Sequence, residues 1–169
     1  KSCFAVIVAL CLGGEVVGGW IHAPVEDITV WAISGEGAWL DEAGTRRRLR
    51  PERPRNIAEM RGSLTHRAYE RLYDRRLGMG VPPPVAVVRY GSTGREYIDL
   101  GIGALHFAQY TRLKPWDHAA GVLVHREAGG YDALRGSGAP YRAEPHIVAG
   151  SLLLAPDVAT WQALDRDLG

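Results

Sequence analysis

Residues 115–121 read Pro-Trp-Asp-His-Ala-Ala-Gly, and residues 127–130 read Glu-Ala-Gly-Gly. Pro115 fixes where the chain leaves a loop, because proline holds its own φ at about −65° and biases the preceding residue away from helix. Asp117 then occupies the position of an N-cap or first-turn acid. The small residues that follow allow close packing, and the glycine pair ends the helix. The stretch predicts a tightly packed helix over residues 117–127 with an acid at its mouth.

Two interpretations of Asp117 follow from the residues alone. A lone aspartate before a helix is most often an N-cap. A carboxylate at a helix mouth is also suited to bind Mg²⁺, which takes one or two protein carboxylates together with water and phosphate oxygens. The spacing does not decide between them.

The order Trp-Asp-x-Ala-Ala-Gly, with Glu-Ala-Gly-Gly shortly after it, resembles the second signature of the inositol monophosphatase superfamily. Its members are Mg²⁺-dependent, Li⁺-sensitive phosphatases of sugar and nucleotide phosphates. The likeness extends over nearly the whole chain, and the other similar segments are residues 4–10, 19–24, 34–39, 89–93 and 146–150. The resemblance favours the metal-ligand interpretation of Asp117.

Hydrophobic patterning predicts the elements around this stretch. The continuous apolar run at 4–12 is typical of a strand covered on both faces, and a glycine turn leads from it into a meander with strands at 15–21 and 29–34. Downstream, helices and strands alternate, as in an α/β layer domain. The expected elements are helix 65–77, strand 85–90, helix 92–102, strand 104–110, helix 117–127, strands near 131–134 and 146–150, and helix 156–168.

The resemblance implies an α/β fold class, a layered α-β-α-β-α sandwich of the inositol monophosphatase type. Residues 1–55 would hold the C-terminal strands of an incomplete N-terminal sheet domain whose first strands lie upstream. Residues 56–169 would form the whole C-terminal α/β domain.

Five site residues follow from the resemblance. Asp117 would be catalytic, binding metal and touching the substrate hydroxyl next to the ester. Gly91, Ser92 and Thr93 would contact substrate at a helix start, where free N–H groups and the helix dipole favour an anion or a sugar hydroxyl; plain capping by Ser92 is the alternative. Tyr110 would also bind substrate, seven positions before Asp117. Inositol-preferring members carry glutamate there, and tyrosine lacks its charge, which argues against inositol monophosphate.

Three neighbouring residues are interpreted as structural. His106 stands where many bacterial members carry aspartate, and a strand or surface histidine is the simpler interpretation. His118 follows Asp117 directly, and successive helical residues point about 100° apart, so the two do not form a catalytic pair. Glu127 is expected to be a structural residue at the helix end.

The family's first signature, Asp-Pro-(Ile/Leu)-Asp-Gly-Thr, is absent from this sequence, which starts at Lys1. Family members take most metal ligands, and the threonine that helps activate water, from that signature and an earlier glutamate. The resemblance therefore implies two or three Mg²⁺ ions with their remaining ligands outside this chain. It predicts a phosphomonoesterase, acting on a sugar, inositol or nucleotide phosphate through metal-activated water, that is inactive as this chain alone.

Two other function classes are considered. The chain could be a non-catalytic α/β module for ligand binding or interaction, derived from the same fold. An upstream Asp-x-x-Asp-Gly-Thr would separate the two classes, since one carboxylate does not hold two Mg²⁺ ions tightly. A metal-independent esterase is disfavoured because Ser92 and Ser151 lack the Gly-x-Ser-x-Gly context.

Composition bounds the partners. The 169 residues carry 20 basic and 19 acidic side chains, a net charge of +1, so no strong attraction to nucleic acid or membrane is expected. The arginine-rich run at 46–55 is interpreted as a solvated linker, or as an anion-attracting rim. Cys3 and Cys11 are expected to be free thiols in a reducing cytoplasm, and no apolar run reaches membrane-spanning length. A small phosphate ester is the expected partner, and a homodimer the expected assembly, as in many family members.

Overall fold

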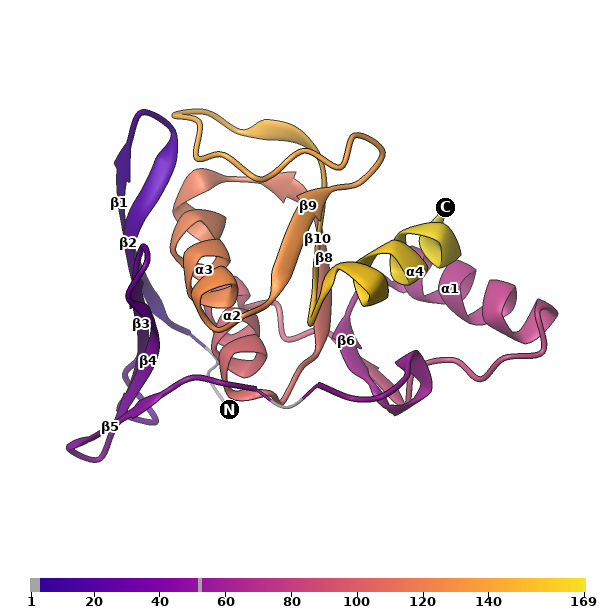
Figure 1. Ribbon diagram of the computed structural model, residues 1–169, viewed down its shortest axis with the longest axis horizontal. Helices are drawn as coiled ribbons and strands as arrows, with labels where there is room; N and C mark the ends of the chain where they lie inside the picture. The colour runs from indigo at the N-terminus through magenta and orange to yellow at the C-terminus, as the bar shows by residue number, and fades with distance from the viewer. Residues whose placement is uncertain (1–3, 52) are drawn as a thin grey trace.

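The computed structural model describes residues 4–51 and 53–169, which form alternating layers of strands and helices (Figure 1). The first sheet is an antiparallel meander in the order β1-β2-β3-β4-β5. Its strands are β1 (Val6–Leu12), β2 (Glu15–Ala23), β3 (Ile28–Ile33), β4 (Gly37–Glu42) and β5 (Thr45–Arg48). Helices α2 (Thr93–Ile102) and α3 (Pro115–Glu127) lie between this sheet and the second one.

The second sheet has the order β7-β6-β8-β10-β9. Its strands are β6 (Arg61–Ser63), β7 (Ala86–Val88), β8 (Phe107–Leu113), β9 (Tyr131–Leu134) and β10 (Val148–Ala155). β6 is parallel to both β7 and β8, whereas β10 is antiparallel to β8 and β9. A 3₁₀ turn (Ile57–Glu59) precedes β6, and helices α1 (His66–Gly78) and α4 (Val158–Leu168) form the last layer. The predicted α/β layered class is confirmed, and the domain division at residue 55 stays a prediction.

Most predicted elements are present, with shifted ends. α3 runs to Glu127 as expected, and Gly129 follows it with a φ of 93° in the left-handed region. The strand expected at 104–110 is β8, which starts at Phe107, and the strand expected at 146–150 is β10, which continues to Ala155. Patterning did not predict the strands β4, β5 and β6, and the last two have no apolar pattern of their own.

The prediction that strand 4–12 is covered on both faces is wrong for the described residues. The side chains of Phe4, Val6, Val8, Leu10 and Leu12 are 52–64% exposed. They share one face of an edge strand that pairs with β2 alone, while Ala5 and Ile7 pack against the core. A continuous apolar run looks the same in sequence whether one or both faces are buried.

The arginine-rich run was interpreted as a solvated linker, but its first residues form edge strand β5. Arg46 lies 4.8 Å from the centroid of the Trp31 ring and makes two hydrogen bonds to Asp41. Arg48 lies 5.7 Å from the Trp39 ring centroid. Stacking of guanidinium groups on indole rings stabilises this edge and explains why a charged segment is ordered here.

Small residues let α3 approach its neighbours closely, as the sequence predicted. A Cβ on Gly121 would lie 2.1 Å from the Tyr97 ring of α2, and a Cβ on Gly19 of β2 would lie 2.8 Å from Cα of Ala120. Such contacts are shorter than any side chain tolerates. Glycine at these two positions therefore sets the spacing of α3 from both α2 and the first sheet.

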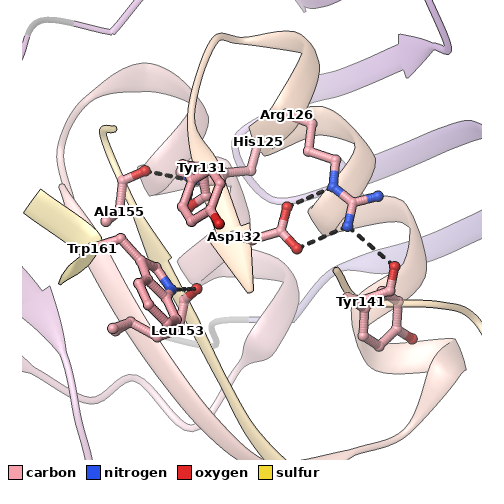
Figure 2. Close-up of polar contacts among 8 residues, drawn as sticks. All are labelled: His125, Arg126, Tyr131, Asp132, Tyr141, Leu153, Ala155 and Trp161. Atoms are coloured by element: carbon pink, nitrogen blue, oxygen red, sulfur yellow. Dashed lines mark hydrogen bonds and ion pairs between the residues drawn. The ribbon is translucent and has the colours of Figure 1, made fainter. Parts of the chain in front are cut away.

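A buried polar cluster fixes the C-terminal end of α3 to the second sheet (Figure 2). The Arg126 guanidinium donates two hydrogen bonds to the Asp132 carboxylate, at 2.6 and 2.9 Å, and a third to the Tyr141 carbonyl. His125 Nε2 lies 3.0 Å from the Ala155 carbonyl oxygen. Burial lowers the pKa of His125, so the ring is neutral and Nε2 carries the proton that it donates.

Glu127 ties the same helix end to the first sheet. Its two carboxylate oxygens accept hydrogen bonds from the backbone N–H groups of Gly35 and Gly37, each at 2.8 Å. Gly35 lies in the turn between β3 and β4, and Gly37 is the first residue of β4. The interpretation of Glu127 as a structural residue agrees with this geometry.

Cys11 is an exposed free thiol, while the prediction for Cys3 falls outside the described residues. Among the helices of residues 4–51 and 53–169, none has the length and apolar character needed to cross a membrane.

Candidate functional site

A polar cavity of about 290 Å³ opens where the parallel strands of the second sheet end. β6, β7 and β8 run in the same direction, and each is followed by a helix, so the starts of α1, α2 and α3 meet at one edge. Ligands commonly bind at the carboxyl ends of such strands, because helix N-termini there present N–H groups and a positive dipole end. The lining residues are Ser63, Leu64, Thr65, Arg89, Gly91, Ser92, Thr93, Glu96, Gln109, Tyr110, Thr111, Arg112, Lys114, Asp117 and His118.

All five residues predicted for the site line this one cavity. Gly91, Ser92 and Thr93 form the entry to α2, and Gly91 has a φ of 71°, which glycine adopts without strain. Ser92 is the N-cap residue by position, but its side chain makes no capping hydrogen bond. Its hydroxyl is therefore not engaged in the plain capping role that was the alternative.

Asp117 lies in the first turn of α3, and the N-cap position belongs to Lys114. The N-cap interpretation of Asp117 is therefore wrong, because Pro115 starts the helix two residues earlier than predicted. The Asp117 side chain is 31% exposed, and Oδ2 lies 3.2 Å from Lys114 Nζ. Its carboxylate lines the cavity and is partly exposed to solvent.

A metal ion at Asp117 would need further ligands. Within the described ranges there is no group of three or more His, Cys, Asp or Glu side chains able to hold one. A hard cation such as Mg²⁺ takes carboxylate oxygens and water, so Asp117 fits as one ligand of a site completed from outside these residues.

His118 is buried beside the cavity and is held by two hydrogen bonds. Its Nε2 lies 3.2 Å from the Arg112 carbonyl oxygen, and its Nδ1 lies 3.1 Å from the Tyr97 hydroxyl. Because a carbonyl only accepts, Nε2 carries the proton and Nδ1 accepts from Tyr97. Burial lowers the pKa of His118 and keeps the ring neutral. With both nitrogens engaged, His118 orients its neighbours and is not a free base.

Tyr110 packs against both Tyr97 and His118, with ring centroids 5.5 and 4.7 Å away, and the three rings form one cluster. Its hydroxyl is buried and has no hydrogen-bond partner among the described residues. Burial is the main cause that raises the pKa of Tyr110, and the nearby Tyr97 and Glu96 side chains add to the rise.

Sequence reasoning missed several cavity residues. Glu96 of α2 is 5% exposed and Gln109 of β8 is 7% exposed, while Arg89 and Arg112 are exposed at the rim. Burial raises the pKa of Glu96, opposed by the nearby hydroxyls of Tyr110 and Ser63. An acid in the first turn of a predicted substrate-binding helix was the available signal for Glu96.

His106, interpreted as a strand or surface residue, accepts a hydrogen bond from the Arg61 N–H through Nδ1 and is not part of the cavity lining.

The chain belongs to the inositol monophosphatase family, whose sequence model matches residues 1–162. It is 30% identical over 154 residues to an inositol-1-monophosphatase of Bacillus subtilis, covering 88% of this chain and 56% of that protein. It is 29% identical over 133 residues to a fructose-1,6-bisphosphatase/inositol-1-monophosphatase of Thermotoga maritima, covering 75% and 47%. A Nus factor SuhB of Pasteurella multocida is 25% identical over 162 residues, covering 92% and 58%. The chain thus spans about half the length of these relatives.

Solved structures agree on the fold. The structure of a Thermotoga maritima IMPase has a TM-score of 0.78 at 23% identity, covering 97% of this chain and 60% of that one. The extragenic suppressor protein SuhB of Bartonella henselae has a TM-score of 0.76 at 23% identity, covering 97% and 61%. The arrangement of sheets and helices is therefore that of the inositol monophosphatase fold.

Proposed function

We propose that this chain supplies the substrate-binding half of a Mg²⁺-dependent phosphomonoesterase, and that catalysis needs carboxylates from outside it. One observation carries the proposal: Asp117 and the entry to α2 line the same cavity, at an edge where three helices begin. Family membership supports it, because matched relatives bear the names of phosphatases of inositol and fructose phosphates. The substrate would be a sugar, inositol or nucleotide phosphate.

Asp117 would hold one of the two or three Mg²⁺ ions and orient the hydroxyl next to the ester. When bound, Mg²⁺ neutralises the phosphate charge and lowers the pKa of the attacking water. Arg89, Arg112 and Lys114 lie around the opening of the cavity and attract the dianionic ester. Positive charge at the rim and a helix dipole at Ser92 both favour the phosphate group over neutral competitors.

Gly91, Ser92 and Thr93 would bind substrate through backbone N–H groups and hydroxyls. Tyr110 offers one hydroxyl where inositol-preferring relatives offer a carboxylate, so we propose an ester other than inositol monophosphate as the preferred substrate. A homodimer in the cytoplasm is part of the same proposal, and the free thiol of Cys11 is compatible with that reducing compartment.

A non-catalytic interaction module is the second candidate. It is favoured by relatives that carry the name Nus factor rather than phosphatase, among them the SuhB proteins of Pasteurella multocida and Salmonella typhimurium. The two candidates differ in one property, which is metal-dependent release of phosphate by the complete gene product.

The test is Asp117→Asn in the complete gene product. Loss of a metal ligand should lower Mg²⁺-dependent phosphate release more than about 100-fold, exceeding the usual effect of removing an outer-shell partner. The thermal midpoint should stay within about 3 °C of the parent, because Asp117 is partly exposed and is not the N-cap. Asp74→Asn, at an exposed position on α1, is the control and should keep full activity. An Asp117→Asn variant with normal activity would overturn the assignment.

A further inference from the structure

The cavity is electrostatically graded from rim to floor. Arg89 and Arg112 are exposed at its opening, whereas Glu96 and Gln109 are more than nine-tenths buried in its wall. A phosphate ester entering this gradient is oriented, because its charged group is held at the basic rim. The organic part of the ester then faces the buried groups.

Two buried polar atoms of residues that line the cavity lack partners. The Tyr110 hydroxyl and the Gln109 Oε1 atom are buried and make no hydrogen bond within residues 4–51 and 53–169. Gln109 is itself anchored, since its Nε2 donates to the Ser151 hydroxyl at 2.7 Å. An unpartnered buried polar atom costs about 1–3 kcal/mol, so such atoms are rare unless something else pairs with them.

Glu96 lies near the first of these atoms, the Tyr110 hydroxyl, and has acceptor sites that are not filled. One carboxylate oxygen accepts a long hydrogen bond, 3.4 Å, from the Tyr90 N–H, and the hydroxyls of Tyr110 and Ser63 are near the carboxyl group. A carboxyl group has more acceptor sites than this contact fills. Glu96 is therefore a carboxyl group available to a ligand hydroxyl at the deep end of the cavity.

We propose that Glu96 is a specificity-determining residue whose carboxyl group accepts a hydrogen bond from a hydroxyl of the leaving group. The Tyr110 hydroxyl donates a hydrogen bond to a neighbouring hydroxyl of the same leaving group. The inference rests on the proposed phosphatase function. Glu96 presents its carboxyl group from α2, whereas Tyr110 presents a hydroxyl from β8. The leaving group it selects is a polyhydroxylated alcohol, since neighbouring hydroxyls can accept from Tyr110 and donate to Glu96 together.

The experiment compares two esters in the complete gene product with Mg²⁺. Inositol 1-phosphate has a polyhydroxylated leaving group, and p-nitrophenyl phosphate has a leaving group without such hydroxyls. Glu96→Gln keeps the shape and one acceptor, and it should lower kcat/KM for inositol 1-phosphate about 10-fold to 100-fold, as loss of a charged hydrogen bond does. For p-nitrophenyl phosphate, kcat/KM should stay within about twofold, because that ester makes no contact with Glu96.

Asp99→Asn is the matched control. Asp99 lies one turn further along α2, is 3% exposed, and pairs with Arg95 at 2.9 Å rather than facing the cavity. Its substitution should lower the thermal midpoint and leave the ratio of the two kcat/KM values unchanged. An equal loss for both esters in Glu96→Gln, or an unchanged ratio, would overturn the inference and mark Glu96 as structural.

Failure of the proposed function has a different signature. If the complete gene product with Mg²⁺ releases no phosphate from these two esters or from sugar and nucleotide phosphates, the proposed function is wrong, and calorimetric titration with inositol 1-phosphate then decides the inference. Saturable binding that Glu96→Gln weakens by the same 10-fold to 100-fold supports a hydroxyl subsite at Glu96. Absence of binding, or equal binding by both proteins, overturns it.

Discussion

At its C-terminal end α3 contributes His125 and Arg126 to a buried polar cluster, whereas at its N-terminal end it contributes Asp117 and His118 to the cavity. In the C-terminal cluster the charged and ring groups have partners: Arg126 with Asp132, and His125 with a strand carbonyl (Figure 2). At the cavity end, the Tyr110 hydroxyl and Gln109 Oε1 have none among the described residues. A fully paired network stabilises one conformation, while an incompletely paired one has capacity left for a ligand.

The sharpest test of the paired end is Asp132→Ala. The Asp132 side chain is fully buried, and its loss leaves the Arg126 guanidinium with only a carbonyl partner. Removing one member of a buried ion pair should lower the free energy of unfolding by about 3 kcal/mol, near the lower end of the usual range because Arg126 is 31% exposed. Urea denaturation measures this.

Asp41→Ala is the matched control for that measurement. Asp41 also pairs with an arginine, Arg46, but their side chains are 38% and 59% exposed. Exposed pairs contribute little to stability, so the urea midpoint should not move measurably. Equal losses of unfolding free energy in Asp132→Ala and Asp41→Ala would mean that the buried ion pair at the end of α3 stabilises the protein no more than an exposed pair does.

The paired end was hard to predict from sequence, for a physical reason. The alternating elements and the glycine stop of α3 follow from local signals, and they are present as predicted. Arg126 and Asp132 lie only six residues apart, but their contact depends on how β9 returns against the helix. Which face of β1 is exposed depends likewise on packing, and an apolar run carries no such information.

More of the cavity end of α3 than of its paired end was predicted from the sequence, but not all of it. Five residues chosen by resemblance lie around one cavity, since four sit at helix starts that parallel strands bring together and Tyr110 lies on β8 beside them. Glu96 was missed because it lies on helix α2, while its neighbours Ser63 and Tyr110 lie on strands β6 and β8, in other parts of the sequence. The prediction of Asp117 as an N-cap was wrong for a local reason, because the helix starts at Pro115, before Asp117.

A smaller effect is expected from pH, because both ends of α3 bury a neutral histidine. Burial lowers the pKa of His118 and of His125, so the unfolded chain binds protons more readily than the folded chain. Their contribution to stability is complete above the unfolded value of about 6.5 and is lost as pH falls toward the folded values. Urea denaturation from pH 8 down to about pH 5.5 should show this fall, smaller than the effect of Asp132→Ala.

His125→Gln measures how much of this pH dependence of stability comes from the histidine at the C-terminal end of α3. Glutamine does not titrate, so the fall in stability below about pH 6.5 should become shallower in this variant, even if its stability at neutral pH is lower. The raised pKa of Glu96 has the opposite effect, since the contribution of this carboxyl group to the stability of the protein is lost as pH rises through its pKa in the folded state. The same pH dependence of stability in His125→Gln and in the parent would contradict neutral burial of His125.

The smallest effect, and the one with the unusual sign, is expected from Tyr110→Phe. This change removes a buried hydroxyl that has no partner in the described part of the chain and keeps the ring packed against Tyr97 and His118. Without ligand, stability should rise by up to about 1 kcal/mol, which is a thermal midpoint a few degrees higher. Tyr97→Phe is the control in the same stack, and it should lower the midpoint, because the Tyr97 hydroxyl bonds to His118 Nδ1 at 3.1 Å. If both variants lose stability alike, the Tyr110 hydroxyl is already paired, and the two ends of α3 do not differ in the way proposed.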